Sequence, residues 1–199
     1  MEYLMIVIIS YLIGSISPSL ILTKLLKGID IREVNTKSAG ASNATLTLGL
    51  KWGVLVGVLD VLKGLIPIVV LRYLYPENDY LWMLGGLSVM FGHIYPIYSN
   101  YHGGKGTSAY VGIIIGAAPI IGISLMLFLI IGTIVTNYVV TGTVLYITAT
   151  PLVLLFFNFT IISIIIVLLM SSLSFYKHFE NIKRWFKKEE LSFKAALKK

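Results

Sequence analysis

The sequence predicts an all-α, polytopic integral membrane protein, on three observations. First, 57% of the 199 residues are hydrophobic and only 13% are charged, and the mean hydropathy is +0.88. Such a chain has too little polar surface to cover a water-soluble fold, so lipid must surround much of it. Second, the apolar residues form long runs without the strict alternation of barrel strands. Third, backbone groups in lipid must be paired within their own segment, and continuous apolar runs do this as helices.

Six apolar segments approach the roughly 20 residues that a helix needs to cross a bilayer. They are 3–23, 53–74, 80–98, 109–136, 138–156 and 159–176. Nearly all basic residues lie in three polar stretches, the loops 24–51 and 99–107 and the tail 177–199. By the positive-inside rule these stretches are cytoplasmic, whereas the acidic turn around Glu77 and the N-terminus lie outside.

The number of crossings follows from this orientation. If 99–107 and 177–199 are both cytoplasmic, the chain between them crosses the membrane an even number of times. Gly112, Gly116 and Pro119 interrupt the segment 109–136, so we expect two short or tilted helices there. The count is then about seven transmembrane helices, with five as the alternative. Neither a soluble domain nor a repeat is evident, so residues 1–199 form a single membrane domain.

The composition narrows the classes of partner. Basic cytoplasmic loops account for most of the net charge of +7, and without a soluble basic module nucleic acid is not an expected partner. The lysines of the tail alternate with aromatic residues such as Phe179 and Phe186, which suits a helix lying on anionic lipid headgroups. The three histidines lack partners at metal-ligand spacing, so no metal site is expected.

A glycine-rich segment, Gly103-Gly-Lys-Gly106, stands at a predicted cytoplasmic edge just before an apolar run. Successive N–H groups of such a turn, together with Lys105 and a helix N-terminus, attract phosphate. The segment is short and is not a Walker A sequence. An ordinary loop whose glycines permit tight packing is the alternative.

Five polar side chains lie in or beside apolar segments. Asp60 and Lys63 are three residues apart and can pair across one helical turn. They either hold helices together by neutralising each other or take part in function. We expect His93 to support a helix end by hydrogen bonding. His178 and Asn181 share one helical face at the membrane boundary, where an imidazole either moves a proton, binds an anion, or belongs only to a basic anchor.

The run Gly92-His-Ile-Tyr-Pro-Ile-Tyr-Ser-Asn-Tyr-His-Gly-Gly-Lys-Gly106 resembles a signature of the bacterial acyl-phosphate:glycerol-3-phosphate acyltransferases, in which G-H-x-[FY]-P is followed by G-G-K-G. Further similarities occur in order at Gly14-Ser-Ile16, Asp30-Ile-Arg32, Gly40-Ala-Ser-Asn43, Asp60-Val-Leu-Lys-Gly64, Tyr138 to Thr143 and His178-Phe-Glu-Asn-Ile-Lys-Arg184. The resemblance therefore spans most of the chain.

The resemblance implies an enzyme of phospholipid synthesis that moves a fatty acyl chain from acyl phosphate to the 1-hydroxyl of glycerol 3-phosphate, giving lysophosphatidate. It implies a multi-pass protein of the cell (inner) membrane, surrounded by membrane lipids, without a cofactor, and supplied with its donor by a phosphate acyltransferase. The implied catalytic residues are His178, Asn181, Thr36 and Lys105. The implied phosphate-binding residues are Gly103, Gly104, Gly106, Lys37, Ser38 and Asn43. The implied supporting residues are Asp60, Lys63, His93, Arg184 and Glu190.

The chain departs from the family pattern in three places. The family's G-S-G-N-P-G-A-T-N reads Asn35-Thr-Lys-Ser-Ala-Gly-Ala-Ser-Asn43, and Leu46 stands where the family has an arginine. Lys37 is near enough in sequence to supply the charge, although an ammonium does not reproduce a bidentate guanidinium. The family's R-Y-x-S becomes Asn137-Tyr-Val-Val140, and its G-T-E becomes Lys188-Glu-Glu190. Two alternative functions remain: a transporter or flippase, and a catalytically inactive binder of anionic phospholipid.

Overall fold

The structure is a computed structural model that describes residues 1–197. Every regular element in this range is helical, which confirms the predicted all-α class. The α-helices are α1 (Glu2–Ser15), α2 (Pro18–Lys27), α3 (Ala41–Leu48), α4 (Leu50–Leu74), α5 (Asp79–Ile94), α6 (Thr107–Ala117), α7 (Pro119–Thr136), α8 (Val139–Leu154), α9 (Ile161–Phe186) and α10 (Phe193–Leu197). Two 3₁₀ turns are η1 (Ile31–Glu33) and η2 (Ile97–Ser99). The last two residues of the predicted basic tail, Lys198 and Lys199, lie outside the described residues.

Helices of membrane-spanning length make up much of this fold. Within residues 1–197, four segments are long and apolar enough to cross a bilayer: Glu2–Lys27, Leu50–Leu74, Pro119–Thr136 and Ile161–Phe186. Helices α6 and α8 are shorter and also apolar. Large apolar side chains such as Ile131 and Val135 are exposed on the outer faces. Surface of this kind is stable in hydrocarbon and not in water.

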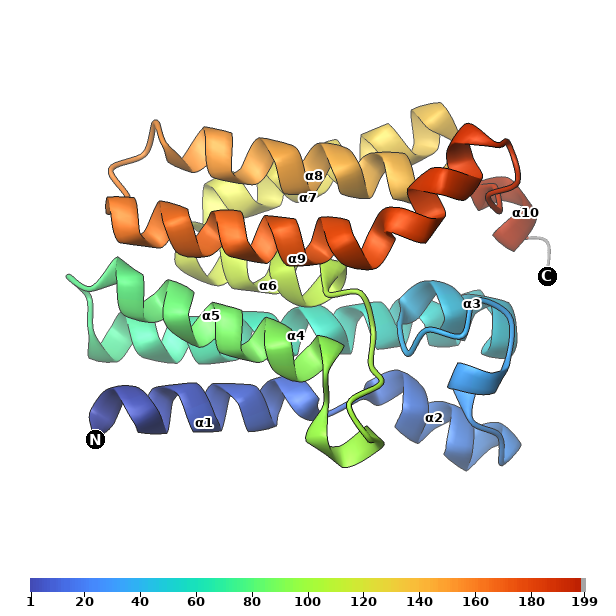
Figure 1. The fold of residues 1–199 in the computed structure, drawn as a ribbon, viewed down its shortest axis with the longest axis horizontal. Coiled ribbons are helices and arrows are strands. Elements are labelled where there is room, and N and C mark those ends of the chain that lie inside the picture. Colours follow the sequence, from blue (N-terminus) through green and yellow to red (C-terminus); the bar gives the residue numbers. More distant parts are fainter. Residues whose placement is uncertain (198–199) are drawn as a thin grey trace.

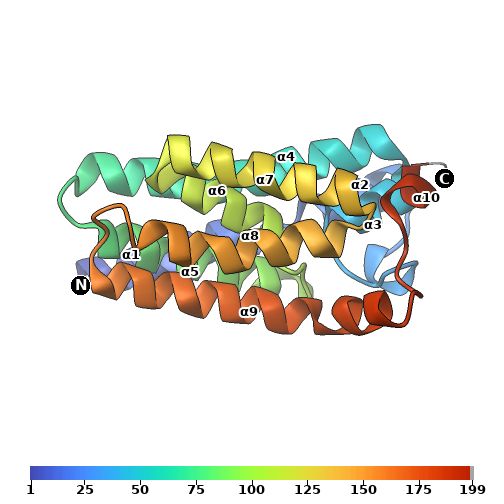
Figure 2. The ribbon, with the colours of Figure 1, turned by 90° about the horizontal axis from the view of Figure 1, so that it is seen from above.

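The long apolar segment 109–136 consists of two helices, as we expected from the glycines and the proline that interrupt it. Helix α6 ends at Ala117 and α7 begins at Pro119. Proline is well placed in a first helical turn, where its missing N–H has no helical partner to lose. Figure 2 shows α7 lying alongside α6.

Helix α6 packs backbone against backbone on α4. A Cβ atom on Gly112 would lie 1.9 Å from the carbonyl oxygen of Val61, and one on Gly64 would lie 2.2 Å from that of Ala109. Only glycine permits so close an approach of two helices. The N-terminus of α6, which follows the glycine-rich segment, is therefore held firmly on α4.

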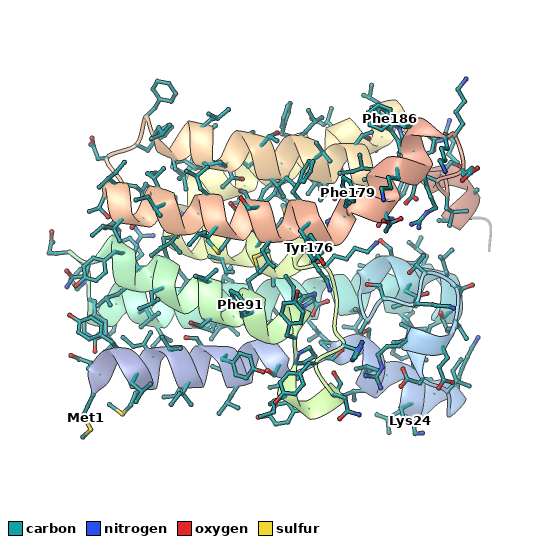
Figure 3. The ribbon with its side chains drawn as sticks, in the orientation of Figure 1. Met1, Lys24, Phe91, Tyr176, Phe179 and Phe186 are labelled. Atoms are coloured by element: carbon teal, nitrogen blue, oxygen red, sulfur yellow. The ribbon has the colours of Figure 1, made fainter. Side chains whose placement is uncertain are left out.

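The basic loop 24–51 and the described part of the basic tail, 177–197, lie at one end of the bundle. Figure 1 shows α2, α3, the end of α9 and α10 at this end, whereas the N-terminus and the α4–α5 and α8–α9 connections lie at the other. In Figure 3, Met1 and Lys24 mark opposite ends of the α1–α2 edge. The predicted cytoplasmic loop 24–51 is more ordered than a simple loop, since it contains η1 and α3.

The break between α1 and α2 is closed by a lysine from α4. Lys63 Nζ donates to the carbonyl oxygen of Ile16 at 2.8 Å and pairs with Asp60 Oδ1 at 2.8 Å. Asp60 and Lys63 are buried inside the bundle, where an unpaired charge is costly, and Ile16 lies at its outer face. The expected pairing of Asp60 with Lys63 across one turn is thus present.

Three of the expected apolar segments differ from the helices in the structure. The segment 3–23 is divided into α1 and α2, because Pro18 begins a new helix, and α2 continues to Lys27. Helix α5 ends at Ile94 instead of continuing to 98, because a residue before Pro96 is disfavoured in the helical region. Helix α9 continues ten residues beyond the expected end at 176, to Phe186. Its C-terminal part is no longer continuously apolar, but it buries Ser174, His178 and Asn181 along one face.

Candidate active site

The glycine loop, defined as residues 101–106, folds back over the end of α5. The N–H groups of Gly103 and Gly104 donate to the carbonyl oxygens of Ile94 and His93 at 3.1 and 3.0 Å. These bonds satisfy carbonyls that a helix end leaves without intrahelical partners. In this structure the two amides are therefore occupied by α5, and any contact with phosphate would fall to Lys105 and to the amides that follow it.

Lys105 extends from this loop to the C-terminal part of α9. Its Nζ donates to Asn181 Oδ1 at 2.5 Å. Loss of hydration lowers the pKa of the Lys105 ammonium to about 8, an effect opposed by Glu190 and reinforced by Arg184 and Lys177. Because the Lys105 ammonium has already lost part of its hydration in the folded protein, it is suited to binding an anion.

The buried face of α9 presents His178 beside the start of α6. His178 Nδ1 lies 2.9 Å from the carbonyl oxygen of Ser174. A carbonyl only accepts, so Nδ1 carries the hydrogen and Nε2 of the neutral ring is the acceptor. The Thr107 hydroxyl lies 3.4 Å from Nε2 and donates to it. This arrangement leaves Nε2 as a base aimed at the N-terminus of α6.

Asn181 is fixed by charged groups on both sides of its amide. Its Nδ2 donates to Glu190 Oε1 at 2.6 Å, and Arg184 Nε donates to the other carboxylate oxygen at 2.8 Å. Since Lys105 can only donate and the carboxylate can only accept, the amide has a single orientation. Four of the predicted site residues, Lys105, Asn181, Arg184 and Glu190, thus form one continuous network.

The first signature loop, defined as residues 31–40, is folded around Asn43. The Asn43 Nδ2 group donates to the carbonyl oxygens of Ile31, Val34 and Ser38 at 2.8, 3.1 and 3.0 Å. Its Oδ1 accepts from the Thr36 N–H at 3.4 Å. Asn43 therefore shapes this loop in the structure, and direct contact with phosphate stays a prediction.

The two loops lie against each other. The Ala39 N–H donates to the carbonyl oxygen of Gly103 at 3.3 Å. Arg32 Nη1 reaches the carbonyl oxygen of Ser99 at 2.6 Å, while the same guanidinium pairs with Asp30 and lowers the pKa of that carboxyl. Residues before α3 are in this way joined to residues before α6.

A buried ionic cluster lies directly behind the glycine loop. His93 Nδ1 is 3.5 Å from Asp60 Oδ1, and Asp60 in turn pairs with Lys63. A Cβ atom on Gly104 would lie 2.1 Å from His93 Nε2 and 2.9 Å from the carbonyl oxygen of Ala39. Gly104 thus fits between the imidazole and the first signature loop, and the carbonyl of His93 supports the loop as well.

A polytopic membrane fold with a cation, a base and a carboxylate-held amide at one end has known relatives. The family model described as Glycerol-3-phosphate acyltransferase matches residues 4–188. The chain belongs to the glycerol-3-phosphate acyltransferase family. This confirms the resemblance noted in the sequence.

Solved and curated members of the glycerol-3-phosphate acyltransferase family match over nearly the whole chain. The crystal structure of PlsY, an integral membrane glycerol 3-phosphate acyltransferase in its glycerol 3-phosphate form, has a TM-score of 0.92 and 30% identity, covering 97% of this chain and 96% of that one. Its lysophosphatidic acid form has a TM-score of 0.89 and 27% identity, with full coverage of both chains. Glycerol-3-phosphate acyltransferase 1 of Oceanobacillus iheyensis is 38% identical and covers 96% of this chain and 94% of its own length.

Within this family member, the structure does not join every predicted residue to the network. Thr36 and Lys37 are exposed and Ser38 is half-buried, in a loop that contacts Gly103. Among residues 1–197, the side chains of these three residues form no hydrogen bond with Lys105 or His178. Their roles stay predictions.

Sequence reasoning missed three contributors to the site. Thr107 directly follows the glycine loop, and Ser174 lies four residues before His178, so spacing alone could have placed both beside the imidazole. Arg32 was noted only as part of a similar motif. Its bond to the Ser99 carbonyl depends on a contact across 67 positions, which no local pattern contains.

Proposed function

We propose that this chain transfers an acyl group from acyl phosphate to the 1-hydroxyl of glycerol 3-phosphate, giving lysophosphatidate for phospholipid synthesis. The observation that carries the proposal is the meeting of Lys105, Asn181 and His178 at the start of α6. Family membership supports the acceptor, and the acyl-phosphate donor is the one that the resemblance noted in the sequence implies. A phosphate acyltransferase would supply that donor.

The phosphate of a substrate would bind between Lys105 and the N-terminus of α6. The first amides of a helix carry unpaired N–H groups and the positive end of its dipole. Gly106, at φ 92°, turns the chain into α6 in a conformation that favours glycine. The Lys105 ammonium adds a full charge, and Thr36, Lys37 and Ser38 of the neighbouring loop would complete the site.

The reaction needs no covalent enzyme intermediate, because an acyl phosphate is already activated. The acceptor hydroxyl oxygen attacks the acyl carbonyl carbon, the bond from that carbon to the phosphate oxygen breaks, and phosphate leaves. The hydroxyl proton goes to His178 Nε2 or to the departing phosphate. Asn181, held by Glu190, would orient the acceptor, and such alignment supplies much of the rate increase.

The acyl chain would lie in a groove of about 620 Å³ between α8 and α9. The groove is lined by apolar residues that include Pro151, Leu168, Phe175 and Phe179. Phe175 and Phe179 flank His178 along α9, so a chain in this groove would reach the reacting carbonyl from the bilayer. Leu168→Trp should narrow the groove and shift the preferred donor to shorter chains. An unchanged chain-length profile would place the acyl chain elsewhere.

A direct assay tests the function. Purified protein incubated with acyl phosphate and glycerol 3-phosphate should form lysophosphatidate and phosphate in equal amounts. Movement of lipid across a vesicle membrane without product would support a flippase, and phospholipid binding without either would support an inactive binder. Replacing acyl phosphate by a thioester donor tests the donor class, since only acyl phosphate is expected to react.

The altered first signature loop calls for its own test of the acceptor. If Lys37 replaces the family's arginine, Lys37→Gln should lower kcat/KM for glycerol 3-phosphate about 10- to 100-fold, the loss of a charged hydrogen bond worth about 1.5–3 kcal/mol. Leu46→Arg should then restore activity. Activity that is indifferent to Lys37 and damaged by Leu46→Arg would remove glycerol 3-phosphate as the acceptor.

The orientation in the membrane is part of the proposal. We place the end with α2, α3 and α10 in the cytoplasm and the N-terminus outside, with seven crossings and five as the alternative. Exposed Phe179 and Phe186 alternate with basic side chains along α9 (Figure 3), and Lys183 Nζ lies 4.5 Å from the centre of the Phe179 ring, as suits anionic headgroups. A reporter at Asn78 should be external and one after Lys199 cytoplasmic. Both reporters on one side would exclude the orientation.

A further inference from the structure

The segment that follows α9 returns to the bundle and is fixed there by Asn137. We call residues 187–192 the strap. At its start, the Lys187 N–H still bonds to the carbonyl of Lys183 at 3.2 Å. At its end is α10, whose first two N–H groups, those of Phe193 and Lys194, donate to Asn137 O at 2.7 Å and to Asn137 Oδ1 at 2.9 Å. Figure 1 shows α10 at the end of the bundle that also carries α3.

Asn137 is suited to this contact by its backbone conformation. It ends α7 in the left-handed region, at φ 64° and ψ 20°, where asparagine is tolerated better than most residues. The first N–H groups of any helix have no intrahelical partner and need an external acceptor. Asn137 gives two acceptors, one from its backbone and one from its side chain.

The strap carries Glu190 into the network of the site. The Glu190 side chain is only 12% exposed, and its two oxygens accept from Asn181 and Arg184. A carboxylate on a free chain end would lose much conformational freedom on binding there. Anchoring the strap at both ends removes part of that cost beforehand.

We propose that Asn137 is a positioning residue for acyl transfer: by capping α10 it fixes the strap, and the strap holds the Glu190 carboxylate on Asn181. The inference rests on the proposed function, because Asn181 is taken there to orient the acceptor. Within residues 1–197, Asn137 accepts hydrogen bonds from α10 and forms none with Lys105, Asn181 or His178. Its effect should therefore fall on the rate of the bound complex, kcat, more than on the KM for glycerol 3-phosphate, because the proposed phosphate site contains Lys105 and not Asn137.

Asn137→Gly is the informative variant, since glycine keeps the left-handed backbone and the carbonyl acceptor and removes only Oδ1. It should lower kcat about three- to ten-fold with KM within two-fold, as expected for one lost hydrogen bond. Trypsin cleavage after Lys187 and Lys188 in the strap should become faster by a similar factor. Asn137→Asp retains an acceptor oxygen and should restore both measures.

Asn158 supplies a matched control in the connection between α8 and α9. It is also left-handed, at φ 44°, and lies at the opposite end of the bundle, so Asn158→Gly should change neither measure. In a Glu190→Gln background, Asn137→Gly should lower kcat no further. Faster cleavage with unchanged kcat, or lower kcat with unchanged cleavage, would overturn the proposal. If the wild type shows no acyl transfer, the proposed function and the positioning role both fail, while the cleavage rates still decide whether Asn137 anchors the strap.

Discussion

Lys105 and Asn181 lie 76 positions apart in the sequence and are joined by a hydrogen bond from Nζ to Oδ1. The bond links the glycine loop to the buried face of α9, and neither segment alone contains both a cation and an oriented amide. Glu190 continues the link from the opposite side of the amide. Substitutions in the two segments should therefore be coupled.

Lys105→Met and Asn181→Ala should each lower kcat/KM by about 10- to 100-fold, because each removes a charged hydrogen bond worth about 1.5–3 kcal/mol. The double variant should lose far less than the product of the two factors, since both substitutions remove the same bond. Lys183→Met is the control, because Lys183 pairs with Glu180 at the surface. Fully multiplicative losses would mean that the two residues act separately.

The activity of the free enzyme should depend on pH near 8. Burial lowers the pKa of Lys105 to about 8, so its ammonium is present below that pH and is lost above it. If the ammonium binds phosphate, kcat/KM should be constant at lower pH and fall tenfold per pH unit above about 8. In the variant Lys105→Arg the guanidinium stays charged over this pH range. The activity that remains in this variant should therefore show no fall in kcat/KM above about pH 8. A profile that stays level to pH 9.5 would contradict the assignment.

Gly104→Ala should disturb the glycine loop strongly. Its Cβ would meet the Ala39 backbone carbonyl and His93 Nε2, which belongs to a buried imidazole beside Asp60. We expect a KM for glycerol 3-phosphate that is raised at least tenfold, together with some loss of stability, because Gly104 is buried and does not lie at a free edge. Gly57→Ala is the control, since its Cβ would lie an ordinary 3.5 Å from Ala41 Cβ. If Gly104→Ala and Gly57→Ala had the same KM for glycerol 3-phosphate, the glycine loop would have only a packing role.

Removing one member of the buried pair should cost more stability than removing both. Asp60→Leu leaves the Lys63 ammonium uncompensated inside the bundle, which we expect to cost about 3–5 kcal/mol of unfolding free energy. The double variant Asp60→Leu/Lys63→Met lacks that charge and loses mainly the bond to the Ile16 carbonyl, about 1–3 kcal/mol. Unfolding in detergent measures both. A normal kcat in the folded double variant would make the pair structural, whereas an inactive one would make it functional.

The sequence predicted the helical membrane class, the family and the pairing of Asp60 with Lys63, because these depend on composition, on ordered motifs and on helical periodicity. It did not predict α3, since Ala41–Leu48 lies in a polar stretch without a capping side chain or a clear apolar stripe. The Gly103 and Gly104 amides were expected to face phosphate, but their bonds to α5 depend on how the chain folds back after Pro96. The contact of Asn137 with α10 could not be predicted from the sequence either, because it joins segments 57 positions apart.

The bond from Lys63 to the Ile16 carbonyl also bears on how the protein enters the membrane. The two residues are separated by 47 positions, so during synthesis the break between α1 and α2 reaches the bilayer well before α4 can close it. Until then the Ile16 carbonyl must keep a water molecule or a lipid headgroup as its partner. We therefore expect the N-terminal helices to reach their final depth only when α4 arrives, with residues 1–74 as the smallest unit of insertion in which the protein itself supplies a partner for this carbonyl.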